Sequence, residues 1–261
     1  MPPRQPWWSG RQDGVLHVRL KRWTDFEGFV TTQLAAHPAY IYRGHTSSKW
    51  RLEPTLDRLL RKIGKAADPP TRQAHLDRFR MALRGRRGTN PVALAKPEEL
   101  WAIGQHYGLA TPLLDWTWSP YVAAYFAFAD VIEPDVKYRT VFGLHTQSVE
   151  QRSKQVTETH VGTGAPPALR RIEPLLDENV RLVSQGGLFT WGPDGVDVDS
   201  WVRAHFAGDR GAILVRVDIP SSDRALCLRS LNRMNINHLS LFPEVFGSAR
   251  YCNYWLEIDS Y

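Results

Sequence analysis

Three short stretches of the sequence place charged and polar side chains next to aromatic ones. The first is Tyr42-Arg43-Gly44-His45. Its arginine can present two parallel N–H donors to a phosphate or a carboxylate, and its glycine would let the backbone approach a ligand. A structural arginine paired with a carboxylate of the core explains the same residues equally well, so both interpretations stay open.

The second stretch runs from Gln105 to Thr117 and contains His106, Asp115 and Trp116. We expect a loop over residues 109–118, with the imidazole and the carboxylate close to the start of the next helix, where an anion is favoured. The alternatives are that the aspartate and the threonine only cap backbone groups, that the tryptophan belongs to the core, and that the histidine is structural.

The third stretch is Leu241-Phe242-Pro243-Glu244. A proline in the first helical position would make Glu244 an acid of the first turn. Stabilisation of the helix start explains this glutamate without any function. Residues 179–190 (NVRLVSQGGLFT) form a fourth, less specific cluster of polar and aromatic residues.

Several common enzyme motifs are absent from the sequence. It contains no GxSxG, no GxxxxGK[ST], no HExxH and no GxGxxG, which argues against a serine hydrolase, a P-loop NTPase, a zinc protease and a dinucleotide-binding dehydrogenase of the usual type. The histidines and the two cysteines have no metal-ligand spacing. We therefore predict no metal site.

The elements that would position these residues form an irregular series of strands and helices. We expect a single α+β domain with a mixed central sheet and surrounding helices, preceded by a loosely held arm over residues 1–22. The expected strands cover residues 39–43, 139–145, 188–191 and 212–219. The expected helices cover residues 24–34, 96–107, 119–130, 169–182, 221–233 and 243–256, with a further one after a break at 65–71.

Charge is concentrated in one part of the chain. The net charge is +6, and residues 58–87 contain ten Lys and Arg against two Asp, which gives +8 there and −2 elsewhere. We interpret this block as a basic helical insertion, either a solvated helix face or a docking surface for a nucleic acid. The candidate contact residues are Arg58, Arg61, Lys62, Arg78, Arg84, Arg86 and Arg87.

Composition narrows the class of protein further. The 43% of hydrophobic and 11% of aromatic residues suffice for a packed core and argue against disorder. The N-terminal residues lack the apolar segment of a secretory signal, and the longest apolar stretch, residues 122–132, is too short to span a bilayer. We expect a soluble cytoplasmic protein without a membrane partner.

Taken in order, these stretches resemble the FRG domain family. The resemblance rests on YRG at 42–44, QHYGLATPLLDWTWSPYVAAYFA at 105–127, NVRLVSQGGLFT at 179–190 and LFPEVFGSARY at 241–251, and it extends from about residue 26 to 254. Pro112 stands where the family usually has an arginine, so a ligand that used that arginine would need another cation here. The resemblance implies a bacterial toxin or phage-defence role, with an antitoxin or defence protein as a partner.

The order of the motifs is also similar, more distantly, to that of ADP-ribosyltransferases. This similarity implies that NAD is the substrate, that Arg43 holds it and that Glu244 is the late catalytic acid. His106 or Asp115 would orient ribose hydroxyls or activate an acceptor. The implied NAD-binding residues are Tyr42, Gly44, Tyr107, Trp116 and Thr117.

Three functions remain open at this point. The first is an NAD-consuming ADP-ribosyltransferase or NAD glycohydrolase. The second is a non-catalytic module that binds nucleic acid or a nucleotide. The third is an unrelated enzyme such as a nuclease.

Overall fold

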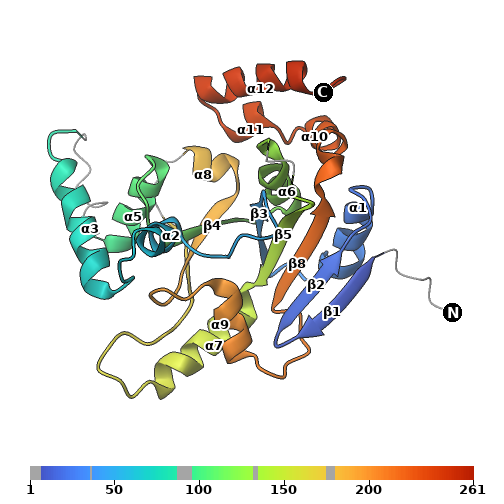
Figure 1. The fold of residues 1–261 in the computed structure, drawn as a ribbon. Helices are drawn as coiled ribbons and strands as arrows, with labels where there is room; N and C mark the ends of the chain where they lie inside the picture. Colours follow the sequence, from blue (N-terminus) through green and yellow to red (C-terminus); the bar gives the residue numbers. More distant parts are fainter. Residues whose placement is uncertain (1–6, 36, 87–95, 132–134, 175–179) are drawn as a thin grey trace.

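The protein has an α+β fold built on one mixed sheet, as predicted (Figure 1). The computed structural model describes residues 7–35, 37–86, 96–131, 135–174 and 180–261. Its strand order is β1-β2-β8-β5-β3-β4-β7-β6. The strands are β1 (Trp8–Gln12), β2 (Val15–Arg19), β3 (Tyr40–His45), β4 (Leu113–Thr117), β5 (Tyr138–His145), β6 (Arg170–Ile172), β7 (Gly187–Trp191) and β8 (Leu214–Pro220).

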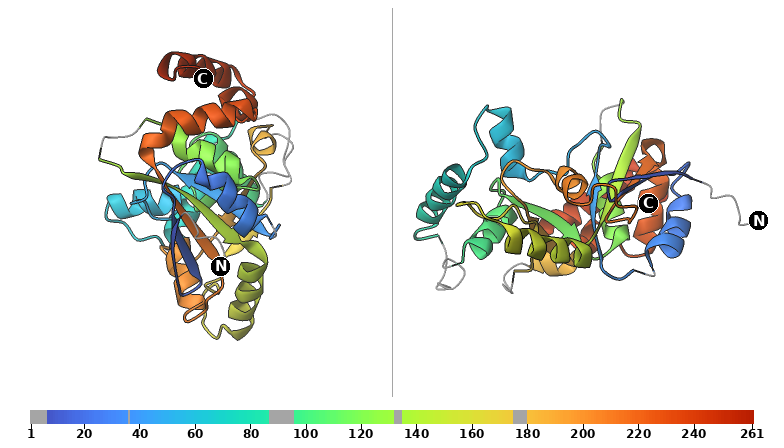
Figure 2. Two further views of the ribbon diagram at one scale, coloured as in Figure 1. Left: turned by 90° about the vertical axis from the view of Figure 1, so that its right-hand side faces the viewer. Right: turned by 90° about the horizontal axis from the view of Figure 1, so that it is seen from below.

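Helices surround this sheet in separate groups, which the further views in Figure 2 also show. Figure 1 shows α2, α3 and α5 gathered beyond β4, α1 near β1 and β2, and α10, α11 and α12 beyond α6. The helices are α1 (Asp25–Phe29), the π-helix η1 (Val30–Leu34), α2 (Thr55–Lys62), α3 (Pro69–Ala82), α5 (Pro97–His106), α6 (Pro120–Ala129), α7 (Thr146–Thr159), α8 (Val180–Ser184), α9 (Val198–His205), the 3-10 helix η2 (Ser221–Asp223), α10 (Arg224–Arg233), α11 (His238–Leu241) and α12 (Val245–Glu257).

The sheet is almost divided in two between β3 and β4. These strands share a ladder of one residue pair, Tyr42 with Thr117, whereas β3 pairs with β5 along its whole length and β4 pairs with β7 along its whole length. Two well-paired halves therefore meet at a narrow seam. The backbone groups next to this seam need partners other than a neighbouring strand.

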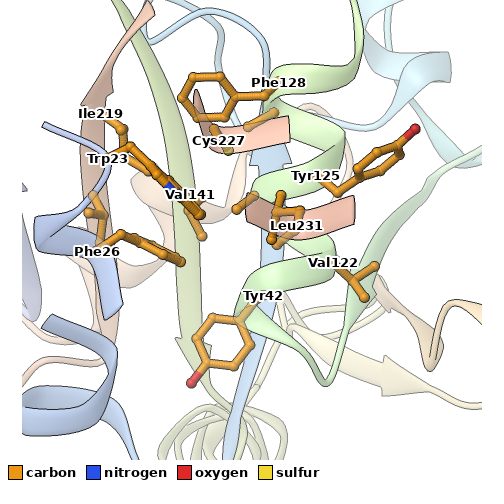
Figure 3. Packing of buried hydrophobic residues seen from close by; sticks show 14 of the residues in the cluster. Trp23, Phe26, Tyr42, Val122, Tyr125, Phe128, Val141, Ile219, Cys227 and Leu231 are labelled. Carbon is orange, nitrogen blue, oxygen red and sulfur yellow. The ribbon is translucent and has the colours of Figure 1, made fainter. Parts of the chain in front are cut away.

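Helix α6 is the buried central helix that the sequence predicts. Ser119 is its N-cap and accepts a hydrogen bond from the Val122 amide at 3.3 Å, and Pro120 follows in the first turn. Its aromatic side chains pack against buried hydrophobic side chains of β5, β8, α10 and the α1 region. Together they form the largest hydrophobic cluster (Figure 3). A Cβ on Gly44 would lie 1.9 Å from the Ala123 carbonyl oxygen, so glycine is needed there for β3 to contact α6.

The basic block is helical and has a core of its own, which joins the sheet. Leu56 and Leu60 of α2 and Leu76 of α3 pack with Trp101 of α5 in a cluster that also contains Phe189 of β7. The expected break at residues 65–71 is shorter than predicted. Asp68 is the N-cap of α3, and the two prolines after it form the first turn, where proline is tolerated because no amide donor is needed.

All four predicted strands are confirmed, as are the helices at 96–107, 119–130 and 221–233, the last of which begins with the 3-10 turn η2. The predicted N-terminal arm is wrong for its described part, because β1 and β2 form a hairpin and β2 pairs in parallel with β8. The predicted loop at 109–118 is also wrong, because residues 113–117 form β4.

Two further expectations need correction. The helix expected over residues 169–182 is replaced by β6 and, after residues outside the described part, by the short α8. The last long helix begins at Val245, so Glu244 is its N-cap residue and Pro243 precedes the helix. Within the described residues, no helix is both long and apolar enough to cross a membrane.

Candidate functional site

A cavity of about 340 Å³ lies at the seam between β3 and β4. Its walls come from these two strands, the C-terminal half of α5, the middle of α6, α8, β7, and the residues after α8 and α11. Seven of the nine predicted site residues line it: Tyr42, Arg43, Gly44, His106, Asp115, Trp116 and Thr117. Glu244 and Tyr107 are not among the lining residues.

Arg43 bridges the seam just beyond the last strand pair. Its Nη1 donates to the carbonyl oxygen of Asp115 at 2.8 Å and to Oδ2 of the same residue at 3.3 Å. Its Nε donates to Nε2 of His45 at 3.0 Å. The guanidinium group thus satisfies a strand carbonyl that has no β3 partner, and its remaining edge faces the cavity. Burial lowers the pKa of Arg43, and the charge of Asp115 raises it.

His45 behind Arg43 is a neutral histidine. Burial, followed by the charge of Arg43, lowers its pKa to about 2. Because Nε2 accepts the hydrogen bond from Arg43, the ring hydrogen is on Nδ1. His45 therefore orients the arginine and does not exchange protons near neutral pH.

Asp115 is held by two donors from different elements. Besides Arg43, the side-chain amide of Gln105 donates to its Oδ1 at 2.6 Å. Gln105 is itself oriented by the buried Thr111, whose hydroxyl donates to Oε1 of the glutamine. The aspartate side chain remains 57% exposed, so its carboxylate faces the cavity with both oxygens already used.

Arg181 of α8 provides a second guanidinium group on the cavity wall. Its Nη2 donates to Oε2 of Glu244 at 2.7 Å, and its guanidinium carbon lies 5.0 Å from the ring centre of Phe242. Glu244 therefore reaches the cavity only through Arg181, and its half-exposed side chain stands at the rim. Oε1 of this glutamate has no hydrogen-bond partner among the described residues.

His106 lies within electrostatic range of this rim pair. Burial lowers its pKa, the positive charge of Arg181 lowers it further, and the charge of Glu244 raises it. The imidazole is accordingly neutral near pH 7 and can accept as well as donate a hydrogen bond.

Four of the lining residues have structural reasons for their identity. The indole of Trp116 is only 3% exposed and donates to Thr190 at 2.8 Å, so it is a core side chain. The hydroxyl of Thr117 donates to the Gln185 carbonyl at 2.6 Å. Tyr42 is buried in the cluster of Figure 3, and Gly44 is required by α6. These contacts explain all four residues without a role in binding NAD, the role that the resemblance implied for them.

Tyr107 differs from these residues because it is 76% exposed. It caps the C-terminal end of α5, and its ring contacts that of His106 edge to face at 4.8 Å. It can contact a molecule that extends out of the cavity and not one that lies inside.

Part of the apolar wall of the cavity, and one of the two arginines that line the cavity, were not among the predicted site residues. Phe126 of α6 and Phe242 line the cavity with their ring centres 6.0 Å apart. Arg181 and Gln185 lie in the cluster at 179–190, whose polar residues beside glycines were the available signal. Asn179 of that cluster lies outside the described residues. The N-terminal amides of α6, expected to favour an anion, do not line the cavity, which contacts α6 first at Ala123.

No group of three or more metal-ligating side chains occurs within the described part of the chain. Cys227 is buried and Cys252 is exposed, and both are free thiols.

The FRG domain family model matches residues 38–135. The predicted FRG resemblance is thus confirmed for the segment that runs from β3 past α6 and contains Arg43, His106 and Asp115. No curated protein and no solved structure matches the chain. Arg181 and Glu244 lie outside the matched segment.

Proposed function

We propose that the cavity binds NAD and that the protein cleaves its nicotinamide–ribose bond, as an ADP-ribosyltransferase or an NAD glycohydrolase. The observation that carries the proposal is the pairing of two guanidinium groups with two carboxylates around one cavity, Arg43 with Asp115 and Arg181 with Glu244. Two cations suit a pyrophosphate, and the rings of Phe126 and Phe242 offer an apolar wall to a base or to nicotinamide.

The two carboxylates would have different roles. Both oxygens of Asp115 accept hydrogen bonds from the protein, so this residue fixes Arg43 and Gln105. Glu244 has one oxygen bound by Arg181 and one without a protein partner among the described residues. A ribose bound at the rim would place a hydroxyl next to this free oxygen, which can accept its hydrogen bond and stabilise the positive charge that develops on the ribose.

In the proposed reaction the bond between ribose C1′ and the nicotinamide nitrogen breaks, and its electron pair leaves with neutral nicotinamide. Water or an acceptor then forms the new bond to C1′ and releases a proton. Neutral His106, next to the rim pair, is placed to receive that proton. Pro112 stands where the family usually has an arginine. If that arginine binds the ligand in relatives, Arg181 can supply the cation in this chain.

The test is release of nicotinamide from NAD by the purified protein, with and without cell lysate. We expect Glu244→Gln to reduce release at least 100-fold and Asp115→Asn to reduce it less, through a raised KM. The matched control is Glu257→Gln, which removes another glutamate paired with an arginine, Arg224, at 3.0 Å. Equal release by wild type and Glu244→Gln would refute the role of Glu244, and no release under any condition would refute NAD cleavage.

A second candidate function is a module that binds nucleic acid without catalysis. The observation in its favour is a set of exposed lysines and arginines on α2, on α3 and next to them, which form no ion pair within the described residues. This function predicts salt-dependent binding of nucleic acid that is unaffected by Glu244→Gln.

A further inference from the structure

The basic block contains two kinds of cation. Arg61, Arg72 and Arg80 are paired with Glu53, Asp57 and Asp77, respectively. Six others are exposed and have no ion pair among the described residues, and we call them the basic surface: Arg58, Lys62, Lys65, Arg78, Arg84 and Arg86. Arg87, also predicted as a contact, lies outside the described residues.

The acidic residues of this region cannot neutralise the basic surface. Asp57 is buried against Arg72, Asp68 accepts the Thr71 amide as the N-cap of α3, and Asp77 is bound to Arg80. The six cations of the basic surface therefore have no ion pair among the described residues, and they outnumber the one unpaired carboxylate of this group, that of Asp68. A surface of one sign attracts a polyanion and accelerates its association.

One end of the basic surface is close to the cavity. Arg58 and Lys62 are four residues apart on α2, so they lie on the same side of that helix, and Lys65 follows its end. The buried face of α2 packs in one hydrophobic cluster with Ala102 and Phe189, and both of these residues line the cavity. The positive surface thus extends from the region of the seam out along α2.

We propose that the acceptor of the ADP-ribosyl group is a nucleic acid, whose phosphates bind the basic surface so that one nucleotide reaches the mouth of the cavity. This inference rests on the proposed cleavage of NAD. Exposed Tyr107 at the end of α5 is available to stack on a base. Phosphate contacts of this kind position a strand and carry no sequence information.

In the transfer step a nucleophilic atom of the strand, a base nitrogen or a phosphate oxygen, forms a bond to ribose C1′ of NAD. The C1′–nicotinamide bond breaks at the same carbon, and nicotinamide leaves with the electron pair. A proton carried by the nucleophile passes to His106 or to water. The products are nicotinamide and an ADP-ribosylated strand, and no oxidant or reductant is needed.

The experiment uses NAD labelled in its adenylate phosphate together with a 20-nucleotide single-stranded DNA, the same sequence as a duplex, and the corresponding RNA. Label on the nucleic acid and release of nicotinamide are measured in the same reaction. Transfer of label to at least one of the three probes is expected. Release of nicotinamide with label on none of them, or on lysate protein alone, would overturn the nucleic-acid acceptor and leave NAD cleavage standing. Absence of nicotinamide release would overturn both.

A charge-reversal variant tests the surface itself. Lys62→Glu, Lys65→Glu and Arg78→Glu together are expected to reduce labelling at least tenfold, with nicotinamide release in the absence of nucleic acid unchanged. Binding of fluorescent single-stranded DNA should weaken, and its dependence on salt should become less steep.

The control variant carries Lys21→Glu, Lys154→Glu and Arg233→Glu, which make the same change in net charge at exposed positions elsewhere. It should label nucleic acid like the wild type. Equal losses in the two variants would mean that net charge alone matters and would overturn the assignment of the basic surface.

Discussion

Two arginine–aspartate pairs in different regions of this protein have opposite relations to solvent. Between α2 and α3, Arg72 and Asp57 are only 6% and 5% exposed, and a second carboxylate, Asp194, also contacts Arg72. At the seam, Arg43 is paired with Asp115, whose side chain is 57% exposed. The first arginine has carboxylates on both sides, whereas the second keeps one edge towards a cavity. The difference shows that enclosure, and not the residue types, separates a structural pair from a candidate ligand-binding pair.

Removal of the enclosed arginine should have the largest effect. Arg72→Met leaves Asp57 and Asp194 without their cation, and we expect the free energy of unfolding to fall by about 3–5 kcal/mol, measured by urea denaturation. Arg80→Met on the same helix removes an exposed pair with Asp77 and should cost less than about 1 kcal/mol. Equal losses would show that enclosure does not matter here.

Two histidines differ in the same way, one being enclosed in the protein and the other facing the cavity. His238 is buried, and burial, followed by the charge of Arg250, lowers its pKa to about 4, whereas His106 faces the cavity. Below the unfolded-state pKa of about 6.5 the unfolded chain binds a proton at residue 238 and the folded chain does not. This group should therefore lower the free energy of unfolding by about 3 kcal/mol as the pH falls from about 6.5 to 4.

Urea denaturation at several pH values measures this contribution. His238→Gln should flatten the dependence on pH over that range, even if the variant is less stable at every pH. The control variant His160→Gln should keep the wild-type slope. An unchanged slope in His238→Gln would contradict the assignment.

Replacement of Arg43, which faces the cavity, should lower the stability less than replacement of Arg72 does, but it should weaken ligand binding. Arg43→Met leaves the exposed Asp115 solvated and removes one donor from buried His45, so we expect a loss of about 1–2 kcal/mol. Isothermal titration with NAD should show at least tenfold weaker binding. NAD binding that survives in Arg43→Met would remove the arginine from the proposed site.

The smallest effect on stability is expected at the rim. Glu244 is half exposed and its pair with Arg181 is accessible to solvent, so Glu244→Gln should change the free energy of unfolding by less than about 1 kcal/mol. Thermal denaturation checks this value. A larger loss would mean that the turnover experiment reports folding and not chemistry.

The sequence predicted correctly those helices and strands whose ends are determined by residues close to one another in the chain. Ser119 followed by Pro120 located the start of α6 to the residue, because a cap and a first-turn proline act within one turn. β4 was missed because its partners are far away in sequence, as in the pair Asp115 with Phe189 of β7. Without that pairing, the sequence predicts only a loop over residues 109–118 between two helices.

The candidate site was predicted in its residues more than in its geometry. The four separate stretches did converge on one cavity, and the alternative that Trp116 belongs to the core is confirmed, but nothing local indicated that Gly44 is required by α6. The role of Arg181 depends on Glu244, which is brought to it by the packing of α8 beside α11. Such a pair becomes visible only when the fold is known.

The parallel pairing of β2 with β8 has a consequence for the order of folding. Val15 lies opposite Leu214, so the hairpin of β1 and β2 cannot complete its sheet until the residues of β8, about 200 positions later, have left the ribosome. Closing so long a loop is slow compared with forming local contacts. During synthesis the N-terminal hairpin therefore exposes a strand edge, and its docking onto β8 is expected among the last steps of folding.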